Sequence, residues 1–187
     1  YGVSVSKKLA KRITWGLVAV AIVAFAFFGY EMLSVDSSEL SMSKMDGSWK
    51  ELATDDVTIM YQFNKNGEFT EMRTMDDDGT KYGSMCTGTW ELSQQGILGQ
   101  CISMKYDLES LVVDGHNEET GEVYDESDPT VNEMKQTLYA KYQKENQEVD
   151  KYKGTDKVYG LNNLTFSNDT IKQNGISIMV KIGDINR

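Results

Sequence analysis

The chain of 187 residues contains only one histidine, one proline and two cysteines, and its 19 basic residues are outnumbered by 29 acidic ones. A net charge of −10 repels a phosphate backbone, so nucleic-acid binding is excluded as a main function. One histidine and two cysteines are too few ligands for a zinc finger or a di-histidine metal site. We therefore expect no metal site, no cofactor and no nucleic-acid partner.

The charge is unevenly distributed along the chain. Residues 1–12 carry four basic side chains and no acidic one, which leaves 15 basic against 29 acidic residues, a charge of −14, for the rest. Residues 13–30 carry no charge and are almost entirely apolar. As a helix they would extend roughly 27 Å at about 1.5 Å per residue, close to the hydrocarbon thickness of a bilayer. The pattern predicts a transmembrane helix in contact with the lipid bilayer.

The basic residues before this segment predict the topology. Positive charge is retained on the cytoplasmic side, so the N-terminus is expected in the cytoplasm and the remainder outside it, in the periplasm. Ala24 and Ala26 form an Ala-x-Ala pattern, but Phe27 and Phe28 prolong the apolar run, so we favour an uncleaved signal anchor over a cleaved signal peptide. The predicted segments are a cytoplasmic basic stub at residues 1–12, a transmembrane signal anchor at residues 13–30, a tether at residues 31–46 and a folded domain at residues 47–187.

Within the folded domain the apolar residues alternate with a period of two, which is typical of β-strands. Val57, Ile59, Tyr61 and Phe63 would share one strand face, and so would Ile176, Ile178, Val180 and Ile182. Turn sequences rich in Asn, Asp or Gly separate the strands, at residues 64–67, 76–79, 93–96, 167–169 and 174–175. This pattern predicts a mainly β fold, an antiparallel up-and-down barrel of about eight or nine strands.

One helix is predicted before the last strands. Asp128 is a suitable N-cap and Pro129 suits the first helical position. Apolar residues then recur at helical spacing until about Asp150, at Val131, Met134, Leu138, Tyr142 and Val149. The pattern fits a helix packed on the outside of the barrel or across one end, and a mobile lid over a ligand cavity is the alternative.

Three short motifs occur in a characteristic order. Gly47-Ser48-Trp49 opens the first strand, residues 61–69 form a Phe-x-x-x-Gly-x-Phe hairpin, and Gly88-Thr89-Trp90 begins a later strand. This order resembles the lipocalin-like domains of bacterial cell-envelope proteins, here with an N-terminal membrane anchor, over roughly residues 46–183. The resemblance implies a lipocalin-like barrel closed at one end by Trp49 and Trp90, with an interior that accepts a small apolar ligand.

The predicted ligand-binding residues are those expected to face the barrel interior: Val57, Ile59, Tyr61, Phe63, Trp90, Ile178 and Val180. The same pattern also fits an interior filled by side chains.

Two functions follow, either binding of a small apolar ligand or lipid, or assembly of an envelope protein complex through the barrel surface and an acidic loop. No nucleophile elbow, phosphate-binding glycine loop or zinc-protease motif is present, so we expect a non-enzymatic protein without catalytic residues.

Two further features have alternative interpretations. If the turn is centred between Ser93 and Gln94, Cys86 faces Cys101 across two strands, which predicts a disulfide; two buried thiols are the alternative. Residues 107–128 include nine acidic and no basic side chains, together with His116 in a polar sequence. This segment is expected to be a solvated loop, with Ca²⁺ binding or docking on a basic partner as alternatives.

Overall fold

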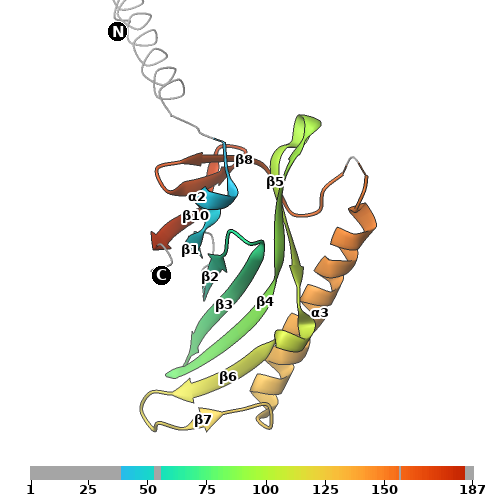
Figure 1. Ribbon diagram of the computed structural model, residues 1–187. Coiled ribbons are helices and arrows are strands. Elements are labelled where there is room, and N and C mark those ends of the chain that lie inside the picture. Colours follow the sequence, from blue (N-terminus) through green and yellow to red (C-terminus); the bar gives the residue numbers. More distant parts are fainter. Residues whose placement is uncertain (1–38, 53–55, 156, 184–187) are drawn as a thin grey trace, which may run out of the picture. The chain divides into compact units, whose positions relative to one another are not determined.

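The computed structural model describes residues 39–52, 56–155 and 157–183, and within them ten strands surround a common core (Figure 1). The strands are β1 (Gly47–Glu51), β2 (Val57–Phe63), β3 (Glu68–Asp77), β4 (Thr80–Gln95), β5 (Gly99–Tyr106), β6 (Val112–Asn117), β7 (Val123–Tyr124), β8 (Leu161–Ser167), β9 (Thr170–Gln173) and β10 (Ile176–Gly183). The helical elements are α2 (Met42–Met45), η1 (Gly96–Leu98), η2 (Leu108–Ser110) and the long α3 (Pro129–Tyr152).

The predicted stub and membrane segment, together with the first half of the predicted tether, lie outside the described residues. In the part of the chain that the structure describes, no helix combines the length and apolar character needed to cross a membrane. The described end of the tether takes part in core packing, because Leu40 is 4% exposed and Met45 in α2 is fully buried. Packing of the core therefore begins before Gly47.

The sheet closes into an antiparallel barrel of eight strands, in the order β1-β2-β3-β4-β5-β8-β9-β10, with β10 pairing back onto β1. Neighbouring strands follow one another along the chain, as in an up-and-down meander, except that β6, β7 and α3 are inserted between β5 and β8. Strand β6 pairs with the first part of β4, and β7 pairs with β6. The predicted mainly β barrel with a helix before the last strands is confirmed, and its general shape is lipocalin-like.

Four of the five predicted turns reverse the chain where expected. The turns after β3, β8 and β9 each hold two consecutive residues with positive φ, namely Asp78 and Gly79, Asn168 and Asp169, and Asn174 and Gly175. Such pairs match the twist of a two-residue hairpin. The turn predicted at residues 93–96 is wrong, because β4 continues to Gln95 and the chain reverses through η1.

Both glycines of the Gly-x-Trp motifs are required by close packing. A Cβ atom on Gly88 would lie 2.2 Å from the Lys105 carbonyl oxygen and 2.6 Å from the Phe69 ring. Gly47 has a φ of +135°, and a Cβ there would lie 2.7 Å from the Gly183 carbonyl oxygen. Only glycine fits these two positions, and each places a tryptophan two residues later in the core.

One end of the barrel, the closed end, is filled by large side chains: Met45, Trp49, Phe63, Phe69 and Trp90 are each 2% exposed or less. The Trp90 ring meets Phe63 edge-on at 5.2 Å between ring centroids. Its indole N–H donates to the Asn64 carbonyl at 3.0 Å, and the Trp49 indole N–H donates to the Met45 carbonyl at 2.8 Å. Both tryptophans therefore bury their apolar area without leaving a polar atom unpaired.

The other end, the open end, lacks part of the barrel wall. Strand β8 pairs with β5 only between Gln100 and Ile102, so the rest of β5 has no described strand on that side. Helix α3 lies along this stretch, as Figure 1 shows. The Asn146 side chain donates to the Tyr106 carbonyl and accepts from the Tyr106 N–H, both at 2.8 Å. The helix thus takes the place of a strand, which corresponds to the predicted position across one end.

Candidate functional site

A cleft of about 310 Å³ lies at the open end, between the first half of α3 and strands β2, β3 and β4. Its described lining residues are Val57, Arg73, Thr74, Met75, Tyr82, Ser84, Thr130, Glu133, Met134, Thr137 and Leu138. The surface that they expose to the cleft is mainly apolar, and Arg73 and Glu133 are the only charged residues among them. The volume is at the lower end of the range of about 300–1,000 Å³ for small-molecule sites.

Strand alternation and helical spacing bring these side chains together. On β3, every second residue after buried Phe69 faces inward, and this set includes Arg73 and Met75. On β4, every second residue from Tyr82 to buried Trp90 faces inward in the same way. On α3, the lining residues recur every three or four positions between residues 130 and 138, which places them on one face of the helix. The cleft is therefore the unfilled continuation of the barrel interior.

A buried polar cluster lies next to the cleft and joins three elements. Glu71 on β3 is 1% exposed; one of its carboxylate oxygens accepts from the hydroxyl of Tyr106 on β5 at 2.7 Å. The other oxygen accepts from the hydroxyl of Tyr142 on α3 and from Nε of Arg73. The two tyrosine rings stack, with 4.1 Å between their centroids. These contacts attach α3 to the inner surface of the barrel.

The cluster fixes the protonation states of its members. Burial alone would raise the pKa of the Glu71 carboxyl, but the hydrogen bond and charge of Arg73, with hydrogen bonds from Tyr142 and Tyr106, lower it below its usual value. Burial and the neighbouring Glu71 charge raise the pKa of both tyrosines. At neutral pH Glu71 is ionised, and both phenols keep the protons that they donate to it.

The predicted interior residues divide between the packed core and the cleft. Ile59, Tyr61, Phe63 and Trp90 are 7% exposed or less and belong to the core, whereas Val57 lines the cleft. The Tyr61 and Phe63 rings stack at 5.7 Å between centroids, so no space remains between them for a ligand. The interior is filled at the closed end and hollow at the open end.

The remaining two predicted residues lie on β10, away from the cleft. Ile178 and Val180 are half-buried, and Ile178 packs against the core. The side chain of β10 that is buried is Met179, at 3% exposure, whereas Ile176 and Ile182 are 70% and 52% exposed. A register shift just before Met179 interrupts the pairing with β9, so the alternation in the sequence does not define one inner face.

The predicted disulfide is wrong, because Cys86 and Cys101 are free, buried thiols. The hairpin reverses through Gly96–Leu98, later than expected, so Cys101 pairs with Ser93 in the β4–β5 register. Cys86 lies opposite Glu71 on the other neighbour, β3. Burial raises the pKa of both thiols, which disfavours the reactive thiolate. The alternative of two buried thiols is the one that the structure shows.

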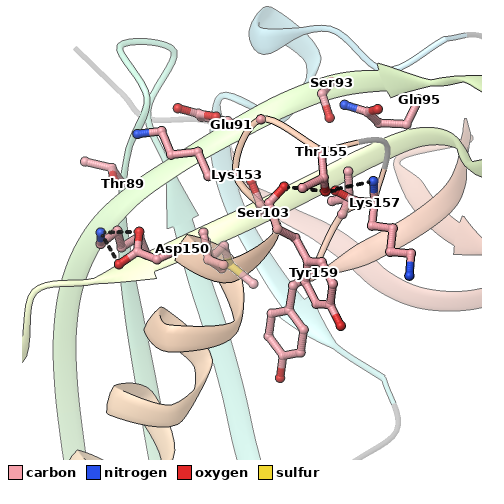
Figure 2. Close-up of a pocket in the computed structure, with 16 residues that line it drawn as sticks. Thr89, Glu91, Ser93, Gln95, Ser103, Asp150, Lys153, Thr155, Lys157 and Tyr159 are labelled. Atoms are coloured by element: carbon pink, nitrogen blue, oxygen red, sulfur yellow. Dashed lines mark hydrogen bonds and ion pairs between the residues drawn. The ribbon is translucent and has the colours of Figure 1, made fainter.

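A second, polar groove of about 240 Å³ lies against β4, β5 and the end of α3 (Figure 2). Strand β4 contributes Thr89, Glu91 and Ser93, which alternate with inward-facing residues. An ion pair of 2.7 Å between Lys105 and Asp150 connects β5 with the helix at one end of the groove. Most of the lining residues carry hydroxyl or charged groups, so this groove suits the apolar ligand that the sequence predicts less well than the cleft does.

The acidic segment forms η2, β6, β7 and the approach to α3, and several of its carboxylates have partners. These are Asp107 with the Glu109 amide, Glu118 with Lys81, Asp125 with Ser127, Glu126 with Lys135, and Asp128 with the first turn of α3. His116 is exposed on β6 rather than in a loop. Over the described ranges, no three His, Cys, Asp or Glu side chains group as a metal ion would require.

Sequence reasoning missed Glu71, Arg73 and Tyr106 as members of a site. One signal could have indicated the first two, because they stand two and four residues after Phe69 and so share its inward strand face. A charged pair at such positions must be neutralised by neighbours. Tyr106 and Tyr142 could not be assigned as those neighbours, since only the folded chain brings the three elements together.

No protein family, curated protein or solved structure matches this chain. The function of the cleft is therefore inferred from its own geometry and from the sequence.

Proposed function

We propose that this protein is a non-enzymatic binding module of the bacterial cell envelope, in which a membrane-anchored, lipocalin-like barrel binds one small apolar ligand or lipid. The observation that carries the proposal is the cleft at the open end. Its walls present Val57, Met75, Tyr82, Met134 and Leu138 to a volume of about 310 Å³. Burial of an apolar ligand against such walls contributes roughly 25 cal/mol for each Å² removed from water.

The chemistry of the neighbouring cluster supports binding rather than catalysis. The side chain of Glu71 has 0% exposure, so its carboxylate does not reach a molecule in the cleft. Tyr106 and Tyr142 direct their hydroxyl protons to Glu71. A general base must come within hydrogen-bond distance of the proton that it removes. The cluster instead holds one wall of the cleft in place.

The anchor and the extracytoplasmic location are supported by the sequence. Residues 13–30 form an uncharged apolar run long enough to span a bilayer, and residues 1–12 supply the basic residues that stay in the cytoplasm. A barrel tethered in this way would take up apolar molecules close to the membrane. This location is tested by introducing cysteines after residue 31 and treating cells with a membrane-impermeant thiol reagent. We expect labelling from outside the cytoplasm, and labelling only from the cytoplasmic side would contradict the location.

Ligand binding is tested with N-phenyl-1-naphthylamine, a neutral apolar dye whose fluorescence increases in apolar surroundings. We expect the protein to bind this dye, and Leu138→Trp, which fills the cleft, to weaken binding by about tenfold or more. Tyr139→Trp is the matched control, because Tyr139 is the next residue of α3 and is 43% exposed. It should change the affinity by less than about twofold.

Two results would contradict the proposal: no binding of the dye by the wild-type protein, or equal affinity of the wild-type protein and the Leu138→Trp variant. Native mass spectrometry of the full chain distinguishes the alternative function as an assembly subunit. A co-purified small molecule supports ligand binding. Stable partner subunits without a small molecule support the assembly function. A contact surface for such a partner is offered by Met85 and Val112, which pair on adjacent strands and are 46% and 51% exposed.

A further inference from the structure

We propose that the ligand of the cleft carries an anionic head group, such as a carboxylate, which binds the outer edge of the Arg73 guanidinium while its apolar part lies along Met134 and Leu138. This inference rests on the proposed function and specifies the class of ligand as a small acidic amphiphile. The observations that carry it are the hydrogen bonds of Arg73, its position in the cleft and the distribution of charge around it.

Toward the residues that the structure describes, the Arg73 guanidinium donates hydrogen bonds from one of its three nitrogens. Nε of Arg73 donates to the Glu71 carboxylate and lies 3.2 Å from the Tyr142 hydroxyl oxygen, which also accepts from it. The two Nη atoms carry four further N–H groups. Among the described residues none accepts a hydrogen bond from these groups. Arginine therefore keeps free the edge that binds a carboxylate through two parallel hydrogen bonds.

These free N–H groups are accessible from the cleft. No buried side-chain nitrogen or oxygen in the described ranges lacks a hydrogen-bond partner, so the Nη atoms must be reached by solvent. The Arg73 side chain is 17% exposed and lines the cleft, whereas Glu71 behind it is fully shielded. A molecule in the cleft thus meets the cation and not its carboxylate partner.

Arg73 is also held in one orientation before any ligand binds. The bonds from Nε to Glu71 and Tyr142 fix one side of the guanidinium, and its centre lies 5.8 Å from the centroid of the Tyr142 ring. A side chain ordered in advance loses little entropy on binding. The only other charge in the described lining is Glu133, which is exposed on α3 and repels an anion.

The test compares two ligands that differ only in the head group, octanoate and octan-1-ol, by isothermal titration calorimetry with the wild-type protein. We expect octanoate to bind about tenfold more tightly, because a charge-assisted hydrogen bond is stronger than a neutral one. Arg73→Gln removes the cation and should abolish the preference. Because this variant leaves Glu71 without its partner and could fail to fold, Glu133→Gln provides a second measurement at an exposed position.

Glu133→Gln should increase the ratio of the octanoate affinity to the octan-1-ol affinity by about twofold or more, because it removes a negative charge that repels only the anion. Equal binding of the two ligands by the wild-type protein, or tighter binding of octan-1-ol, overturns the head-group inference and leaves the proposed function intact. Binding of the neutral dye without binding of octanoate also overturns it. If neither ligand nor the dye binds, the proposed function itself fails.

Discussion

The two ends of the barrel bury their interiors in different ways. At the closed end, Trp49, Phe63 and Trp90 fill the space between paired strands and are almost completely inaccessible to solvent. At the open end β8 stops pairing with β5, helix α3 takes over the wall, and the interior holds a charged cluster and a cleft. In β2, β3 and β4, alternation along the strand therefore determines which side chains face inward. Whether they meet one another depends on how far the neighbouring strands extend.

The largest difference between the two ends should appear on removal of Trp90. We expect Trp90→Ala to lower the free energy of unfolding by about 3–5 kcal/mol, because it removes the contact with Phe63 and leaves a large cavity. Leu138→Ala, at the edge of the existing cleft, should cost only about 1–2 kcal/mol. Urea unfolding of both variants measures these values. Equal costs would contradict a difference in packing between the ends.

The next largest effect is expected at the charged cluster. Glu71→Gln should lower the free energy of unfolding by about 2–3 kcal/mol at neutral pH, because Arg73 loses its buried counter-charge. Urea unfolding measures this change. Glu68→Gln is the control, since Glu68 is exposed on the same strand and the substitution should cost less than about 0.5 kcal/mol.

This variant also has a defined pH dependence. The pKa of Glu71 in the folded protein lies below the value of about 4.3 for an unfolded chain. Its contribution to stability is therefore present above about pH 4.3 and is lost as the pH falls through the folded-state pKa. Unfolding measured from pH 7 to pH 3 should show the difference between wild type and Glu71→Gln shrinking in acid. A constant difference would contradict the ionised state of Glu71.

The smallest effect is expected at the start of α3. The Asp128 carboxylate accepts from the amides of Thr130 and Val131, at 2.9 and 3.2 Å, and Asp128→Ala should cost about 1 kcal/mol. The first turn of α3 forms part of the cleft, so Asp128→Ala should also lower the affinity for the dye. Amide hydrogen exchange should become faster in this turn and stay unchanged at Trp90. Asp125→Ala, in the preceding turn, is the control. Faster exchange at both ends would contradict their independence.

The sequence was sufficient for the parts of the fold that depend on local chemistry. The pair Asn174 and Gly175 favours positive φ at both positions, and Asp128 followed by Pro129 favours a helix start, whatever the rest of the chain does. Strand alternation similarly indicated the buried face of β2. These features explain why the barrel and the helix could be predicted without any relative.

The parts that could not be predicted depend on spatial relations. Ile97 and Leu98 look like strand residues, yet they form η1 and move the register of β5, which separates the two cysteines. Local sequence does not show where β8 ends against β5, nor that α3 lies along the rest of β5 beyond that point. The partners of Glu71 come from elements far apart in the chain, so the site had no contiguous motif.

The pairing of β1 with β10 has a consequence for the order of events during synthesis. The hairpins from β2 to β5 need only local contacts and can form early, whereas β1 gains its second neighbour only when Lys181 arrives opposite Trp49. Until then the nascent chain has an unpaired strand edge beside its most apolar side chains. Chains that end before β10 would keep this edge and self-associate through it.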